Sequence, residues 1–161
     1  MPIRATLLAA ALTGTAAALE GLAAGGDIRA RLAEVRQPKG SPPLSIWIGV
    51  GALYYITGFI VAVRLLSSEP LDTVHAVALG LLTALLLGNA LWNAVFFRRR
   101  DLGLGWKVSR AYALLALGLA VALWRADRLA LWVFLPYLLY LVYGTWWVYK
   151  VWQLNPRKPL H

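Results

Sequence analysis

Four side chains suited to holding a flat aromatic molecule share one helical face near the middle of the chain. Asn89, Trp92, Asn93 and Phe96 stand at i, i+3, i+4 and i+7, which places two carboxamides and two rings on one side of an α-helix. Rings supply stacking area and carboxamides supply hydrogen bonds, so the pattern is typical of a ligand-pocket wall. The alternative is that the two amides hold neighbouring helices together by hydrogen bonds. In both cases the face must point into the protein, because a carboxamide in apolar surroundings is costly.

A second aromatic pattern lies closer to the C-terminus. Tyr140, Gly144 and Trp147 stand at i, i+4 and i+7, and Gly144 leaves a notch between the two rings. Pro136 interrupts the backbone hydrogen bonds one turn earlier and is expected to bend the helix. The pattern predicts an interior aromatic slot. With earlier aromatics added, the candidate ligand-binding residues are Trp47, Tyr54, Asn89, Trp92, Asn93, Phe96, Trp106, Tyr140, Gly144 and Trp147.

The residues of most catalytic chemistries are missing. The chain has no cysteine, and His75, the one histidine away from the terminus, has no second metal ligand at helical spacing. No glycine-rich phosphate loop or nucleophile elbow occurs, so we expect neither an enzyme, nor a metal site, nor a bound cofactor. Glu20 is the one acid within an apolar segment. We expect it at the membrane interface or paired with Arg29, the alternative being a proton-coupling carboxylate.

The composition requires these residues to sit on membrane helices. Hydrophobic residues make up 60% of the chain and charged residues 14%, and the mean hydropathy is +0.64, which leaves too little polar surface for a water-soluble globule. The runs Gly40–Val63, Thr73–Phe97 and Leu129–Tyr149 carry no charge. Each is close to or above the roughly 20 residues that cross a hydrocarbon core. These runs predict three transmembrane helices.

Two further spans complete the prediction. Ala5–Gly26 is apolar except for Glu20, and Ala111–Trp124 becomes long enough if its helix continues past Arg110, whose side chain can reach the interface. We therefore predict an all-α fold, a single membrane domain over residues 1–161 built as a bundle of five transmembrane helices. The approximate helices are 5–25, 45–66, 73–97, 106–124 and 129–153.

The distribution of basic residues predicts the orientation. Of the 16 Lys and Arg residues, four fall on the side of the N-terminus and the others on the opposite side. The four on the N-terminal side are Arg4, Arg64, Arg125 and Arg128. The positive-inside rule then places the N-terminus outside and the C-terminus in the cytoplasm, with Arg98–Arg100 against anionic membrane lipids. Since topology accounts for the charge, we expect no nucleic-acid partner.

The first connection, Asp27–Pro43, contains three prolines, Pro38, Pro42 and Pro43. Proline cannot continue a helix. We therefore predict an extended loop that covers the mouth of the bundle.

Several motifs together resemble a known family. Residues 89–97 read NALWNAVFF, residues 124–128 WRADR, residues 135–138 LPYL and residues 153–155 QLN. In this order and spacing the chain resembles the tryptophan-rich sensory protein (TspO) and mitochondrial translocator protein family over nearly its whole length. The prolines of the first loop and Leu53-Tyr54 match as well.

The resemblance implies a five-helix bundle, usually a homodimer, with a cavity beneath the first loop. Family members bind tetrapyrroles there, so it implies protoporphyrin IX or haem as the ligand, with Asn89, Trp92, Tyr140 and Gly144 on the cavity wall. Gly51 stands about where a cavity tryptophan is usual in the family, and Trp47 is expected to take its place. It also implies a bacterial or archaeal cell membrane.

Four functions follow as alternatives. The first is a ligand-binding protein that stacks a flat, acidic aromatic molecule on Trp and Tyr side chains, with Arg36 or Lys39 offsetting its carboxylates, for sensing or transport. The second is a small transporter of lipids or hydrophobic compounds. The third is photodegradation of a bound porphyrin, and the fourth is a structural subunit whose aromatic residues only pack. The sequence favours the first.

Overall fold

The computed structural model describes residues 3–26, 28–68 and 72–156, and every regular element in those ranges is a helix. The helices are α1 (Ile3–Ala24), α2 (Ile28–Glu34), α3 (Leu44–Leu66), α4 (Thr73–Asn93), the π-helical turn η1 (Ala94–Arg98), α5 (Leu102–Ala126) and α6 (Arg128–Leu154). Among these residues, five helices are long and apolar enough to cross a membrane, α4 counted together with η1. This confirms the predicted fold class.

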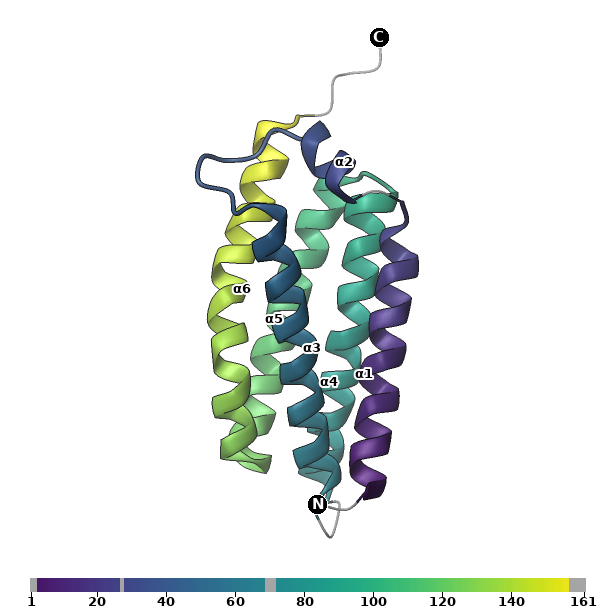
Figure 1. Cartoon of the computed structure of the whole chain (residues 1–161). Helices are drawn as coiled ribbons and strands as arrows, with labels where there is room; N and C mark the ends of the chain where they lie inside the picture. Colours follow the sequence, from purple (N-terminus) through teal and green to yellow (C-terminus); the bar gives the residue numbers. More distant parts are fainter. Residues whose placement is uncertain (1–2, 27, 69–71, 157–161) are drawn as a thin grey trace.

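The five long helices form a closed ring. Going round the bundle, α1 packs against α4, α4 against α5, α5 against α6, α6 against α3, and α3 back against α1. Helix α1 begins and helix α6 ends at opposite ends of the bundle, and the short helix α2 lies across the end where α6 terminates (Figure 1). A ring of five helices leaves a central space, which side chains must either fill or line.

Two boundaries differ from the sequence prediction for local reasons. Helix α5 begins at Leu102, four residues before the predicted start, because the Asp101 carboxylate caps it by accepting a 3.0 Å hydrogen bond from the backbone N–H of Leu104. The first loop was predicted to be extended throughout, but residues 28–34 form α2. The prolines begin only at Pro38, so nothing prevents a helix before them; Asp27 lies outside the described residues.

The half of the bundle away from α2, here called the closed half, is filled by aliphatic side chains. Its largest fully buried side chains come from four helices and are mostly leucine and valine. They include Val61, Leu65, Leu82, Leu85, Leu119, Leu123 and Phe134. Branched side chains of this kind interdigitate closely, so the centre of the bundle is filled at this level.

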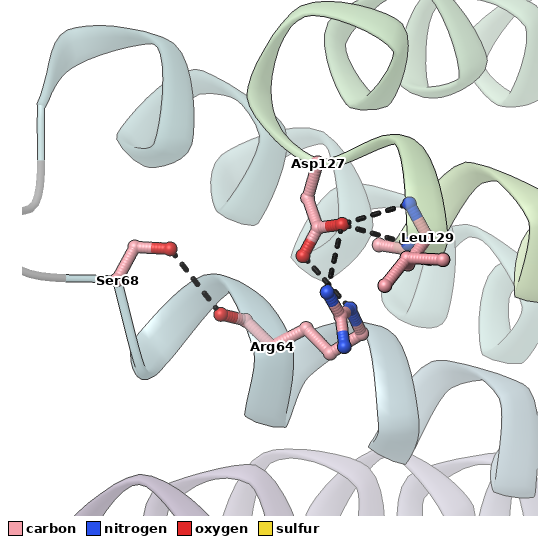
Figure 2. Close-up of polar contacts among 5 residues, drawn as sticks. Arg64, Ser68, Asp127 and Leu129 are labelled. Carbon is pink, nitrogen blue, oxygen red and sulfur yellow. Dashed lines mark hydrogen bonds and ion pairs between the residues drawn. The ribbon is translucent and has the colours of Figure 1, made fainter.

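A polar clamp fastens the end of the closed half. Arg64 of α3 donates to the Asp127 carboxylate through Nε (2.8 Å) and Nη2 (3.0 Å), while Asp127 also caps α6 by accepting from the backbone N–H groups of Leu129 (2.9 Å) and Ala130 (3.0 Å), as Figure 2 shows in part. Burial raises the pKa of Asp127, but the bonds from Arg64 and the α6 amides outweigh it and hold the pKa below its usual range. The clamp joins α3 to the α5–α6 turn.

Candidate ligand-binding site

A cavity of about 380 Å³ opens in the other half of the bundle, beneath α2. This half is called the cavity half below. All six α-helices contribute to the wall, α1 with Glu20 alone and α2 with Ile28 and Leu32. The volume lies within the range of about 300–1,000 Å³ that is usual for small-molecule sites. Most of the wall is apolar or aromatic, which suits a hydrophobic ligand.

Most of the residues singled out from the sequence lie on this wall. They are Trp47, Tyr54, Asn89, Trp92, Asn93, Tyr140, Gly144 and Trp147. Phe96 lies behind the wall, with its ring stacked on Trp92 at a centroid distance of 4.8 Å. Trp106 is also outside the lining and contacts Tyr149 at 5.0 Å and the Arg110 guanidinium at 5.1 Å. Phe96 therefore supports a wall residue, and Trp106 belongs to the outer α5–α6 surface.

The aromatic part of the wall is built where α3 faces α6. The ring of Trp47 lies 4.9 Å from that of Trp147 and 6.3 Å from those of Tyr140 and Tyr143, the last in a stacked arrangement. Gly144 sits one turn from Tyr140, and the three atoms nearest to a Cβ placed on it all belong to the Tyr140 side chain, at 3.7 Å. The glycine leaves this part of the wall without a side chain, next to the Tyr140 ring.

A polar cluster lies on the side of α1 and α4. Asn89 donates through Nδ2 to Oε2 of Glu20 at 2.5 Å, and the Tyr55 hydroxyl donates to the same oxygen. The expected partner Arg29 is replaced by Tyr55 and Asn89, because α1 packs beside α4 and Glu20 lies on the cavity wall. A position of Glu20 near the membrane interface stays a prediction. Asn89 bonds between helices, whereas Asn93 donates within its own helix, to the carbonyl of Asn89 (3.0 Å).

Tyrosines line the cavity where it meets the closed half. The hydroxyls of Tyr112 and Tyr137 are 2.7 Å apart, and the ring of Tyr54 lies 4.8 Å from that of Tyr137. Sequence reasoning missed Tyr112 and Tyr137. Tyr137 continues the stripe of Tyr140 and Gly144 by one turn, so extending that pattern would have found it. Tyr112 carries no such signal, since only the packing of α5 brings it inward.

Two indole N–H groups in the wall have no hydrogen-bond partner. Nε1 of Trp47 and Nε1 of Trp92 are buried and unpaired among the described residues, whereas Nε1 of Trp147 donates to the Ser41 hydroxyl at 2.9 Å. An unpaired buried donor costs free energy. Neither nitrogen is exposed to the open volume, so this cost belongs to the packing of the wall.

Helix α2 is fastened over the cavity by Arg31 and by the end of α6. The Arg31 guanidinium donates to the carbonyls of Phe97 and Ala24 (3.2 Å to the latter), at the ends of η1 and α1. Asn155 is bonded to both the N–H and the carbonyl of Arg36, each at 2.9 Å. Arg36 and Lys39, which were expected to offset a ligand's carboxylates, are exposed and lie outside the cavity lining. Their contact with a ligand stays a prediction.

Comparison with known proteins agrees with this arrangement. A model of the TspO/MBR family matches residues 6–153. This range contains all the cavity-lining residues and the five membrane helices, apart from the first three residues of α1 and the last residue of α6. No curated protein matches the chain closely. Because the family match covers nearly the whole chain, this integral membrane protein belongs to the TspO/MBR family.

Proposed function

We propose that the protein binds a flat, largely apolar aromatic ligand in the cavity between its helices, with tetrapyrroles such as protoporphyrin IX or haem as the leading class. The observation that carries the proposal is the cavity itself, in which aromatic rings from α3, α4 and α6 border an open volume. Trp47 packs on Trp147 at 4.9 Å, and Phe96 joins Trp147 (5.7 Å) to Trp92 (4.8 Å). The rings thus form a continuous wall beside the open volume.

Trp47 and Trp92 offer ring surface to a ligand. Both border the cavity, and a flat ligand that stacks on them gains aromatic contact area. Their N–H groups are buried within the wall, so such a ligand is held by stacking and not by hydrogen bonds to these groups.

The membrane supplies the ligand and sets the orientation of the site. A hydrophobic ring compound concentrates in the lipid, next to the helices that enclose the cavity. The excess of basic residues at the end covered by α2 favours a cytoplasmic position for that end. Homodimer formation and a bacterial or archaeal membrane stay predictions that rest on the family resemblance.

The test is a titration of the protein in phosphatidylcholine nanodiscs with protoporphyrin IX, following tryptophan fluorescence after subtraction of empty nanodiscs. We expect saturable quenching, and we expect Trp92→Leu to raise the Kd about tenfold, since aromatic contacts are worth on the order of 1 kcal/mol beyond the area they bury. The matched control is Trp132→Leu, because Trp132 on α6 is 65% exposed and lies away from the cavity. Absence of saturation, or an equal response of the two variants, would contradict the proposal.

A further inference from the structure

The electrostatic character of the cavity depends on Glu20. Among the described residues that line it, Glu20 is the one Asp, Glu, Lys, Arg or His side chain, and the rest are apolar, aromatic, hydroxyl or amide side chains. The nearby guanidinium of Arg31 is occupied with the carbonyls of Phe97 and Ala24 and is not part of the wall. The charge within the site is therefore opposite in sign to the net charge of +9 on the whole chain.

The hydrogen bonds of Glu20 leave one side of its carboxylate open. Tyr55 and Asn89 both donate to Oε2, and Oε1 accepts no hydrogen bond from the described residues. The two donors fix the carboxyl plane from α3 and α4, while the side chain itself comes from α1. Three helices thus hold an acceptor in place at the cavity surface.

We propose that Glu20 is the recognition site for a cationic or N–H-donating nitrogen on the ligand, so that the cavity selects basic planar aromatic compounds over acidic ones. This inference rests on the proposed function and names the ligand chemistry of the same site. A carboxylate in low-dielectric surroundings attracts a cation and repels an anion much more strongly than it would in water. The bond formed is a charge-assisted hydrogen bond to Oε1.

The aromatic wall favours the same sign of charge. The faces of Trp and Tyr rings carry partial negative charge and attract cations, Trp most strongly. Trp47, Trp92 and Tyr140 all border the cavity that Glu20 enters. A planar aromatic cation therefore meets favourable groups on the ring walls and at the carboxylate.

An acidic tetrapyrrole can still enter, but in one orientation only. Its carboxylates would have to point away from α1 and Glu20, because a like charge beside a partly buried carboxylate is strongly disfavoured. Its pyrrole nitrogens or a basic substituent would face α1 instead. Glu20 thereby orients ligands as well as selecting them.

The experiment compares three probes with the same ring system and different charge: 9-aminoacridine, a cation at pH 7, neutral acridine, and anionic acridine-9-carboxylate. Each is titrated into the protein in zwitterionic phosphatidylcholine nanodiscs, with tryptophan quenching as the readout and empty nanodiscs subtracted. For the wild type we expect binding in the order cation, neutral, anion. For Glu20→Gln, which keeps an acceptor for Tyr55 and Asn89, we expect the Kd of the cation to rise about tenfold or more and the Kd of the anion to fall.

Two variants control for net charge and for folding. Glu34→Gln removes one acidic charge from the exposed end of α2, where Glu34 pairs with Arg100 at 3.4 Å, and it should leave the order unchanged. Glu20→Asp retains the charge on a shorter side chain, and it should keep the order even if all three affinities fall. Circular dichroism of each variant establishes that the helices are intact.

The outcomes separate this inference from the proposed function. Saturable binding of all three probes without charge preference, or a preference that survives in Glu20→Gln, overturns the role of Glu20 while cavity binding stands. Absence of saturable binding for every acridine overturns the inference, and the protoporphyrin IX titration decides the proposed function separately. A cation preference that disappears in Glu20→Gln and persists in Glu34→Gln and Glu20→Asp supports the inference.

Discussion

The two halves of the bundle use the same five helices and meet the central axis with different side chains. In the closed half, leucine, valine and alanine from α3, α4, α5 and α6 interlock and exclude space. In the cavity half, the same helices present tryptophan and tyrosine, with Gly51 and Gly144 between them. The rings pack against one another at the wall, and glycine adds no side chain that would fill the space beside them.

This contrast assigns folding stability to the closed half and the proposed ligand binding to the cavity half. The closed half is fastened by its aliphatic core and by the Arg64–Asp127 clamp at its far end (Figure 2). The cavity half is spanned by α2, which is bonded through Arg31 to the ends of η1 and α1. A site can keep buried, unpaired donors only if another part of the molecule supplies the folding free energy.

The largest expected effect is on the packing of the closed half. Phe134 is 2% exposed, and Phe134→Ala should lower the free energy of unfolding by about 3–5 kcal/mol, because it removes a ring from a filled core. Tyr140→Ala should cost clearly less, because its ring already borders the cavity. The measurement is denaturation in detergent followed by circular dichroism, with exposed Trp132→Ala on the same helix as the control. Equal losses for Phe134→Ala and Tyr140→Ala would erase the distinction between the halves.

A smaller effect is expected at the clamp. Asp127→Ala removes both the α6 cap and the pair with Arg64, and it should lower the free energy of unfolding by about 1–3 kcal/mol. Most of the loss should come from the cap, because the Arg64 side chain is 34% exposed and solvent screens its ion pair. Asp127→Asn keeps the cap and should cost about 1 kcal/mol or less. Protoporphyrin IX affinity should stay the same in both variants. A change in ligand affinity would show that the halves are coupled.

The smallest effect is the dependence of stability on pH. Since the pKa of Asp127 is held below its usual range in the folded protein, its contribution is fully present above the unfolded pKa of about 4 and is lost as the pH falls through the folded value. We therefore expect the thermal midpoint of the wild type to fall more between pH 6 and pH 3 than that of Asp127→Asn. Identical pH profiles for the two proteins would show that the clamp adds no ionic stabilisation.

The sequence predicted the parts of this structure that depend on local pattern. Long uncharged runs gave the membrane helices, because crossing a hydrocarbon core demands them. Helical spacing placed Asn89 and Trp92 on one face and Tyr140 and Gly144 on another. The structure brings all four to the cavity wall. Their role in binding a ligand stays a prediction.

The site residues that the sequence did not predict are those whose position depends on which helices are neighbours. Glu20 belongs to the site only because α1 packs beside α4, and nothing in the residues around Glu20 indicates that neighbour. Tyr112 likewise belongs to the site only because of how α5 packs in the bundle. The charge count included Arg31 only among the basic residues on the C-terminal side, yet its side chain bonds the ends of α1 and η1. Long-range contacts of this kind have no periodic signature.

The most direct test of the central claim is to fill the cavity. Gly51 lines the cavity, and a Cβ built on it meets nothing within 4 Å. Gly49 is the matched control, because a Cβ there also meets nothing within 4 Å but the residue lies outside the lining. Gly51→Trp should abolish saturable binding of protoporphyrin IX and leave the thermal midpoint equal or higher, whereas Gly49→Trp should bind as the wild type does. Unchanged binding in Gly51→Trp, or equal loss of binding in both variants, would show that the ligand does not occupy this cavity.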